Sequence, residues 1–444
     1  MSPLIAHSAE PLKGQIAVPG DKSISHRALI IGALAVGETI IEGLLEGEDV
    51  VATAAALRSL GVDISVDADT GHWSVRGRGI SGLAEPADVL HMGNSGTAAR
   101  LLMGVLAGHP FAATLTGDES LSGRPMGRVI EPLRHMGAQF TTRSQDRLPL
   151  TIQGQAVPLP IEYELPVASA QVKSAILLAA LAAPGTTRVI EPRPTRNHTE
   201  LMLRHFGAEI DVEGQDDGGR VINLHGQPEL SARNVVVPGD ISSAAFPLVS
   251  ALLTAGSEIT INNVGINPLR CGLIETLLEM GGRIELENQR TKAGEAIADL
   301  RLTASPLIGI DVPAERAPAM IDEYPVLAIA AACATGSTRL SGLAELRLKE
   351  SDRLAGMVRG LAACGVDVEE GEDFLVIHGT GAPPAGGATI ATELDHRMAM
   401  AFLVLGGVSE NPVAIDDGGP IDTSFPGFAG LMNGLGCNIK ETSS

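Results

Sequence analysis

The chain has 444 residues, of which 44% are hydrophobic, so it is long enough to form two or three domains with sizeable cores. It carries 32 Lys and Arg against 53 Asp and Glu, and the formal charge of −21 would repel the phosphates of nucleic acids. Any anionic ligand must therefore be held by a local group of cations. The longest apolar run is too short to cross a bilayer, the first residues lack a targeting pattern, and the four cysteines have no C-x-x-C spacing. These features predict a cytoplasmic protein that binds neither nucleic acid nor membranes.

Taken in chain order, one kind of segment recurs six times: a helix that ends in an apolar residue and Gly, followed by a short strand. Its glycines lie 70 to 84 residues apart, as from Gly137 to Gly207 and from Gly281 to Gly365. A glycine just beyond a helix is typical of a left-handed C-terminal cap. The six glycines are Gly61, Gly137, Gly207, Gly281, Gly365 and Gly436.

Each of these units also contains a second helix, which has a polar start and a body rich in Ala and Leu. Because its body is apolar on most faces, such a helix is expected inside a domain, with only its start available for chemistry. The six predicted helices lie within residues 21–37, 93–108, 167–185, 239–256, 321–336 and 394–407.

The sequence Val-Pro-Gly-Asp occurs twice, at 18–21 and at 237–240. Pro-Gly pairs mark abrupt turns, so both places are candidate hinges. Two crossings of the chain there predict a discontinuous first domain, residues 1–20 with 239–444, and a second domain, residues 21–238.

The starts of these helices and some nearby turns are rich in Lys and Arg. Cations are normally unfavourable at a helix N-terminus, which already carries a partial positive charge. Small residues such as Gly96 let backbone N–H groups approach a bound oxyanion as well. In the 349–353 stretch a spacing of four predicts Lys349 and Arg353 on one helix face, with Glu350 beside them. The pattern indicates a pocket for a ligand with several negative charges.

The motifs that carry these residues resemble, in the same order, those of the enolpyruvyl transferases, and within that family the branch that uses shikimate 3-phosphate. The resemblance implies a two-domain inverse α/β barrel with six βαβαββ repeats, three per domain, buried helices, and an active site in the cleft between the domains. The matching stretches are GDKSISHR, GNSGTAARLL, RPMGR, SAQVKSA, IDEYP, LKESDRL and DHRMAM.

The resemblance also implies the reaction. Phosphoenolpyruvate would transfer its enolpyruvyl group to the 5-hydroxyl of shikimate 3-phosphate and release phosphate, on the route to chorismate and the aromatic amino acids. No metal and no organic cofactor are expected. Glyphosate is the expected competitive inhibitor, and a monomer is the expected state.

The same resemblance implies a role for each matching residue. Asp322 would accept the proton of the substrate hydroxyl, while Glu350 and Lys22 would handle protons at C3 and at the departing phosphate. Arginine suits such ligands because its planar fork matches carboxylates and phosphates. The expected phosphoenolpyruvate site is Lys22, Gly96, Arg124, Gln171, Arg353 and Arg397. The expected shikimate 3-phosphate site is Lys22, Ser23, Arg27, Ser169, Gln171, Arg196, Asp322 and Lys349.

Some positions depart from the family pattern. Asp422 and Thr423 stand where many relatives carry a lysine that contacts phosphoenolpyruvate, and Glu345 replaces an Asn. We therefore assign no ligand role to residues 422–423 or to Glu345. The stretches SAQVK and RNHTE resemble the glyphosate-tolerant class, whereas Gly96 is usual in the sensitive class, so the sequence leaves glyphosate sensitivity open.

Three alternatives compete with these expectations. The first is a purely structural role for single residues: Ser23 or Asp322 could be a helix cap, and His26 or His396 could brace its neighbours. The related UDP-N-acetylglucosamine enolpyruvyl transferase is a rival, but it carries Asn after the lysine and a reactive loop Cys, whereas this chain has Ser23 and a Cys-free LSGRPM stretch. A catalytically silent anion-binding relative is the third; the presence of Asp322, Glu350 and Lys22 argues against it.

Overall fold

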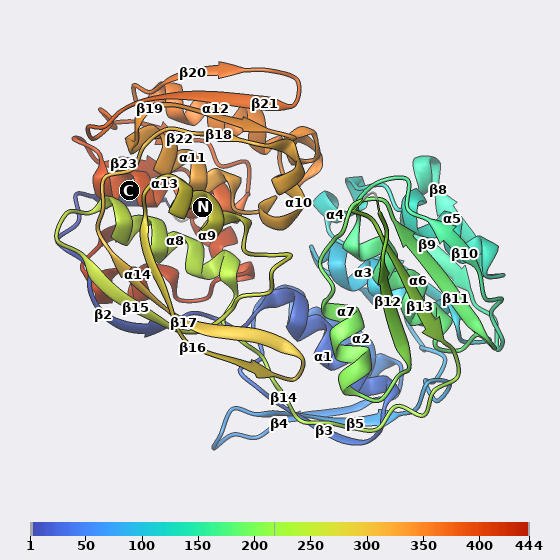
Figure 1. Cartoon of the computed structure of the whole chain (residues 1–444). Helices are drawn as coiled ribbons and strands as arrows, with labels where there is room; N and C mark the ends of the chain where they lie inside the picture. Colours follow the sequence, from blue (N-terminus) through green and yellow to red (C-terminus); the bar gives the residue numbers. More distant parts are fainter. Residues whose placement is uncertain (1–2, 217, 443–444) are drawn as a thin grey trace. The chain divides into compact units, whose positions relative to one another are not determined.

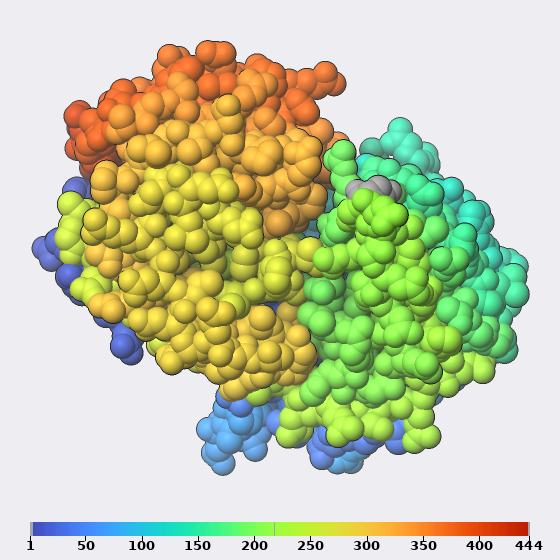
Figure 2. Space-filling model, in the orientation of Figure 1, coloured from blue at the N-terminus to red at the C-terminus, as the bar shows by residue number. Residues whose placement is uncertain are grey.

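The structure is a computed structural model that describes residues 3–216 and 218–442. The chain forms two units (Figure 1). Unit 1 contains the chain up to Pro19, Pro238–Arg290 and the chain from Ala296, whereas unit 2 contains Gly20–Val237 and Thr291–Glu295. In Figure 2 the dark-blue atoms of the N-terminal segment border the yellow and orange atoms of unit 1, so segments from both ends of the chain build this unit.

Unit 2 contains three four-stranded sheets. Their strand orders are β14 (Val235–Val236), β3 (Val36–Glu42), β5 (Trp73–Arg78), β4 (Asp63–Val66); then β6 (Leu90–His91), β7 (Ala112–Thr116), β9 (Arg147–Gln153), β8 (Gln139–Arg143); and then β10 (Glu162–Glu164), β11 (Thr186–Glu191), β13 (Arg220–His225), β12 (Ile210–Gly214).

Unit 1 repeats this plan. Its strand orders are β16 (Arg283–Lys292), β17 (Glu295–Thr303), β15 (Glu258–Gly265), β2 (Lys13–Ala17); then β18 (Asp311–Val312), β19 (Thr335–Ser341), β21 (Phe374–Thr380), β20 (Asp367–Glu370); and then β22 (Thr389–Ile390), β23 (Val413–Ile415), β1 (Leu4–His7), β24 (Asn438–Glu441).

All six sheets have the same pairing. In each sheet one edge strand is parallel to its neighbour, as in β6 with β7 and β10 with β11. The remaining neighbouring strands are antiparallel, as in β7 with β9 and β11 with β13. A parallel pair needs a crossover, and where its two strands are close in sequence, as in β6 with β7 and β10 with β11, a buried helix supplies it. The predicted α/β fold with six βαβαββ repeats is confirmed. Two repeats are interrupted by the passage of the chain between units: β2 pairs with β15, and β14 pairs with β3.

Six helices occupy the interiors of the units. In α1 every residue from Ile24 to Leu34 is buried, and α11 is buried from Tyr324 to Ala332. The sequence prediction of buried, largely apolar helices is therefore confirmed, although α1 ends at Leu34 and Val36 already begins β3. The buried helices are α1 (Lys22–Leu34), α3 (Gly96–Ala107) and α6 (Ala170–Ala180) in unit 2, and α8 (Ile241–Leu253), α11 (Tyr324–Cys333) and α13 (His396–Val408) in unit 1.

A second set of six helices is amphipathic and ends at the repeated glycines. All six glycines have a positive φ, between 80° at Gly365 and 125° at Gly436, which confirms the predicted left-handed caps. These helices are α2 (Glu48–Ser59), α5 (Gly127–His135), α7 (His198–His205), α9 (Gly272–Glu279), α12 (Arg353–Ala363) and α14 (Phe428–Leu435). Short helical segments complete the chain: α4 (Glu119–Gly123), α10 (Ala317–Met320), and 3₁₀ turns at Ser144–Asp146, Ala314–Arg316, Ala344–Leu348 and Gly419–Thr423.

Each unit has its own hydrophobic core, formed by the buried helices and the inner faces of the sheets. In the described part of the chain, none of the helices has both the length and the apolar character that crossing a membrane requires. All four cysteines are free thiols.

The close packing of α3 against α6 in unit 2 predicts a sensitive position. A methyl group on Gly104 of α3 would overlap the backbone of Ala175 on α6. A flexible side chain could move aside to relieve such an overlap, but the backbones of two packed helices cannot. We expect Gly104→Ala to lower the free energy of unfolding by about 1–3 kcal/mol or more. Gly214→Ala, in the same unit and with open space around the added methyl, should change it by less than about 0.5 kcal/mol. Denaturant titration of both variants checks this, and equal effects would contradict it.

Candidate active site

The start of α1 places Lys22 and Ser23 at the edge of unit 2. The side chain of Asp21 caps the helix by accepting a hydrogen bond from the Ile24 N–H at 2.8 Å, so the cap is Asp21 and not Ser23. Lys22 forms an ion pair with Asp49 of α2 and remains partly exposed. Its ammonium group is thus held in place while still open to a ligand.

Arg27 is buried one turn further along α1. Its guanidinium donates to Thr199 Oγ1 and to Ser174 Oγ, each at 2.7 Å, and to the Ser23 carbonyl at 2.9 Å. Burial lowers the pKa of Arg27 to about 10, against the opposing effect of Glu200, so the side chain still carries its charge at neutral pH. Arg27 is a cation fixed by α6 and α7, and its charge faces little solvent.

His26 links α1 to its neighbours. Its Nδ1 lies 2.8 Å from Thr53 Oγ1, and its Nε2 lies 3.5 Å from Ser95 Oγ. Burial, together with the charges of Lys22 and Arg27, lowers the pKa of His26 well below its usual value, so the ring is neutral at physiological pH. These contacts fit the role of a brace between helices.

The starts of α3 and α6 lie together. Gly96 is the first residue of α3, after the cap Ser95, and Ser169 caps α6 by accepting from the Val172 N–H at 3.4 Å. Gln171 accepts from Arg100 Nη1 at 2.9 Å and donates to Thr97 Oγ1 at 3.0 Å. Arg100 Nη1 also donates to the Gly96 carbonyl at 3.4 Å. Arg100 thus joins Gly96 and Gln171, and it is a residue of the GNSGTAARLL motif to which the sequence analysis gave no role.

Two further cations of unit 2 come from connecting segments. Arg124 follows α4 and donates to Asn94 Oδ1 at 2.9 Å and Ser120 Oγ at 3.1 Å, which brings it next to the start of α3. Arg196 lies in the connection between β11 and α7. Its charge contributes to lowering the pKa of Arg27, so the two cations are neighbours.

In unit 1, Arg353 is the centre of a group of carboxylates. Its side chain is 1% exposed and donates to Asp395 Oδ2 at 2.7 Å, to Glu350 Oε2 at 2.5 Å and to Asp322 Oδ1 at 3.3 Å. Burial alone would lower the pKa of Arg353, but the charges of these three carboxylates raise it. In return, Arg353 holds the pKa of the buried Asp395 carboxyl below its usual value, although burial opposes this.

Two more cations approach Asp322. Lys349 Nζ lies 3.3 Å from Asp322 Oδ1, and Arg397 Nη1 donates to the Asp322 carbonyl at 3.2 Å. Unit 1 therefore brings together all five residues that the sequence analysis chose from this part of the chain. They are Asp322, Lys349, Glu350, Arg353 and Arg397.

The predicted helix over 349–353 is wrong. The 3₁₀ turn Ala344–Leu348 ends before Lys349, and α12 begins only at Arg353. The reason is Asp352, whose carboxylate accepts from the Ala355 N–H at 3.0 Å and caps α12. Lys349 reaches Asp322 from a turn, and Arg353 reaches it from a helix.

The capping alternative for Asp322 receives no support. α11 begins at Tyr324, and its N-cap residue is Glu323, which makes no side-chain capping bond. Asp395 is different, because it caps α13 and also binds Arg353. Sequence reasoning placed Asp395 at a helix start but gave it no site role, since a cap and an ion-pair partner have the same sequence signature.

The positions that depart from the family pattern make local contacts. Asp422 accepts from the Gly427 N–H at 3.4 Å, and Thr423 donates to the Pro420 carbonyl at 2.7 Å. Among residues 3–216 and 218–442, no group of three or more His, Cys, Asp and Glu side chains has the geometry of a metal site.

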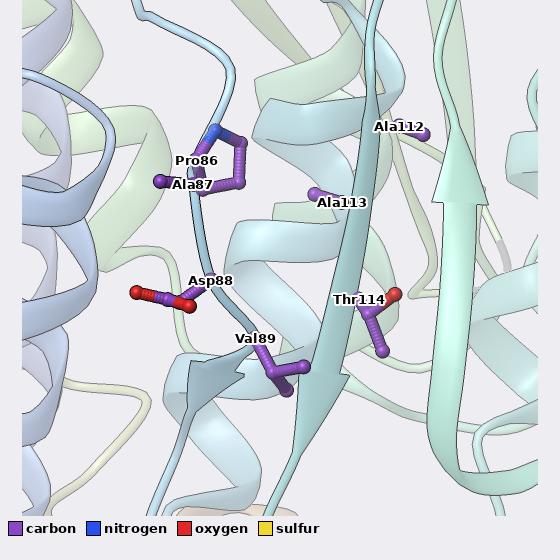
Figure 3. A pocket seen from close by; sticks show the side chains of 7 residues that line it. All are labelled: Pro86, Ala87, Asp88, Val89, Ala112, Ala113 and Thr114. Atoms are coloured by element: carbon purple, nitrogen blue, oxygen red, sulfur yellow. The ribbon is translucent and has the colours of Figure 1, made fainter.

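A pocket of about 290 Å³ lies elsewhere in unit 2, beside β7 (Figure 3). Asp88 and Val89 lie on the segment that leads into β6, and Ala113 and Thr114 lie on β7. Its lining contains one carboxylate and no cation, so it does not suit an anionic ligand.

The two groups of side chains differ in what they can do. The group in unit 2 offers cations and helix N-termini, which suit phosphates and carboxylates. The group in unit 1 sets two carboxylates, Asp322 and Glu350, beside three cations, which combines possible proton transfer with anion binding.

Comparison with known proteins agrees with this chemistry. The family model described as EPSP synthase (3-phosphoshikimate 1-carboxyvinyltransferase) matches residues 7–432. The 3-phosphoshikimate 1-carboxyvinyltransferase of Paramagnetospirillum magneticum is 62% identical and covers 99% of this chain and 98% of its own. That of Rhodospirillum rubrum is 61% identical over the same shares.

Solved structures give the same result. An EPSP synthase from Acinetobacter baumannii superposes with a TM-score of 0.89 at 45% identity, with all of both chains covered. The enolpyruvyl transferase NikO from Streptomyces tendae has a TM-score of 0.79 and covers 100% of this chain and 99% of its own, but at 18% identity it supports the fold alone. With the family model matched over nearly the whole length, the chain belongs to the EPSP synthase family.

Proposed function

We propose that the chain transfers the carboxyvinyl group of phosphoenolpyruvate to the 5-hydroxyl of shikimate 3-phosphate and releases phosphate. Family membership gives the reaction class, and the relatives at 61–62% identity carry the name of this activity. The observation that carries the proposal is the meeting of Asp322 and Glu350 with Lys349, Arg353 and Arg397 in unit 1. The proposal includes a cytoplasmic monomer that glyphosate inhibits in competition with phosphoenolpyruvate.

The reaction needs two proton transfers. In the first step C3 of phosphoenolpyruvate gains a proton, the 5-oxygen of shikimate 3-phosphate bonds to C2, and that hydroxyl loses its proton. In the second step the new methyl group returns a proton, the C2=C3 double bond forms again, and the C2–O bond to phosphate breaks. We assign the hydroxyl proton to Asp322, and the protons at C3 and at the departing phosphate to Glu350 with Lys22.

The substrates carry four anionic groups, two carboxylates and two phosphates. Arg353 and Arg397 would hold phosphoenolpyruvate together with Lys22, Arg124 and Gln171, and Gly96 would let it approach the α3 start closely. Lys349 and Asp322 would hold shikimate 3-phosphate together with residues of unit 2. The unit 2 residues proposed for it are Lys22, Ser23, Arg27, Ser169, Gln171 and Arg196.

The cations that hold Asp322 support its proposed role. Lys349 and Arg353 both approach its Oδ1 at 3.3 Å, so the carboxylate has a fixed orientation before substrate arrives. A proton acceptor that is already oriented needs less reorganisation in the transition state.

The first experiment is a phosphate-release assay. With phosphoenolpyruvate and shikimate 3-phosphate we expect steady release of inorganic phosphate, because the departing group is phosphate. With UDP-N-acetylglucosamine in place of shikimate 3-phosphate we expect none. Release with the sugar nucleotide alone would favour the rival transferase, and no release with either acceptor would favour a silent binding protein.

The two carboxylates are tested by isosteric changes. Asp322→Asn and Glu350→Gln remove the capacity to accept or donate a proton but keep the shape, so we expect each to lower kcat by about 10²-fold or more. Shikimate 3-phosphate should still bind to both variants in calorimetric titration. Glu410→Gln, on the exposed surface of unit 1, is the matched control and should keep the kcat of the wild type. Near-normal turnover in either site variant would rule out its assigned role.

Gly96 is a test of the proposed inhibitor site. A methyl group there would lie 2.7 Å from Arg100 Nη1 and 3.4 Å from Arg124 Nη1, so it would press on both guanidinium groups. Glyphosate is longer than phosphoenolpyruvate and should suffer more from a crowded pocket, by about 1–3 kcal/mol, or roughly 5- to 150-fold in affinity. We expect Gly96→Ala to raise the inhibition constant of glyphosate far more than the KM of phosphoenolpyruvate in steady-state kinetics. Equal changes in the two constants would mean that Gly96 does not line the longer ligand.

A further inference from the structure

Behind Arg27, unit 2 contains a buried group of charges that the proposed mechanism does not use. Lys173 of α6 is fully buried, and its Nζ lies 3.0 Å from Glu191 Oε2 and 2.7 Å from Glu200 Oε1. It also donates to the Thr195 carbonyl at 3.5 Å. An ammonium group has three N–H donors, and the structure gives this one three oxygen acceptors.

The three acceptors belong to one short stretch of chain. Glu191 ends β11, Thr195 lies in the middle of the connection, and Glu200 lies in the first turn of α7. Thr195 Oγ1 also donates to Glu191 Oε1 at 2.5 Å, so the connection is bonded to itself as well as to α6. A single ammonium group therefore fixes the segment 191–200 at its beginning, middle and end.

This segment carries side chains proposed for shikimate 3-phosphate. Arg196 directly follows Thr195, and Thr199 directly precedes Glu200. Thr199 Oγ1 accepts from Arg27 Nε, while Ser174, which directly follows Lys173, accepts from Arg27 Nη2. The Lys173 group and the Arg27 group thus share the same two backbone segments, α6 and the start of α7.

The charges also depend on each other. Among the neighbouring charges that raise the pKa of Arg27, that of Glu200 has the largest effect. The Glu200 carboxylate therefore acts on Arg27 as well as on Lys173. Burial raises the pKa of Glu191 in spite of the neighbouring Lys173. A buried ion network is a weak source of stability, because desolvation offsets much of its attraction, but its geometry is restrictive.

We propose that Lys173 is a positioning residue for shikimate 3-phosphate. By holding the segment 191–200 against α6, it sets the places of Arg196 and Arg27 without touching the substrate itself. This inference rests on the proposed function for the identity of the ligand.

The main test is Lys173→Met, which removes the ammonium group but keeps most of the length of the side chain. We expect the KM and the calorimetric Kd of shikimate 3-phosphate to rise by at least about tenfold, with the KM of phosphoenolpyruvate and kcat changed by less than about threefold. Thr195→Val is a milder variant that removes only the bond to Glu191. It should raise the KM of shikimate 3-phosphate by about three- to tenfold. If Lys173→Met does not fold, Glu191→Gln takes its place, because it removes the charge that faces Lys173 but keeps the shape of the side chain, and it should give the same selective rise in the KM of shikimate 3-phosphate.

Leu177→Ala, at a buried apolar position of the same helix, is the control for a loss of stability alone. It should lower the Tm without a selective change in either KM. The inference is overturned if the foldable variants bind shikimate 3-phosphate like the wild type, if both KM values rise equally, or if Leu177→Ala gives the same selective effect. Failure of the proposed function can be told apart from failure of this inference, because the wild type would then release no phosphate. Calorimetric binding of shikimate 3-phosphate to the wild type and to the variants would still test the role of Lys173.

Discussion

A helix that is apolar on every side is stable only when every side is covered, and six such helices determine the plan of both units. Each runs through the interior of its unit, so its body has no access to a ligand. The first turns of α1 and α13 are partly exposed, at Lys22, Ser23 and Arg397, and the unpaired N–H groups of such helix starts favour anions. The constraint of burial therefore also decides where the polar side chains of the candidate site can lie.

Much of the fold was predictable because its signals are local and repeated. The glycine after each amphipathic helix has the positive φ that its place in the sequence predicts, as at Gly207 and Gly281. The grouping of Asp322, Lys349 and Arg353 was predicted from the resemblance of the motifs. The helix over 349–353 was not predicted correctly. The spacing of Lys349 and Arg353 does not reveal that Asp352 caps a helix that begins only at Arg353.

The contacts that orient the site were not predictable from the sequence. Arg353 and Asp395 are 42 residues apart, and Lys173 and Glu191 are 18 apart. Each side chain taken alone has a simpler reading, a helix cap for Asp395 and a solvated lysine for Lys173. Only the three-dimensional packing shows that these charges are buried and paired, and burial is what makes their geometry exact enough to hold neighbouring side chains in place.

The interrupted repeats have a consequence for the order in which the protein folds as it is synthesised. All strands of unit 2 have been made once Val236 is in place, because β14 then completes its last sheet. In unit 1, β1 lies between β23 and β24, and Thr442 donates to the Pro3 carbonyl across 439 residues of sequence. β1 must therefore stay without its partners until β23 and then β24 have emerged from the ribosome. The three sheets of unit 2 can form before most of unit 1 has been made, whereas unit 1 can be completed only after β24 has been made.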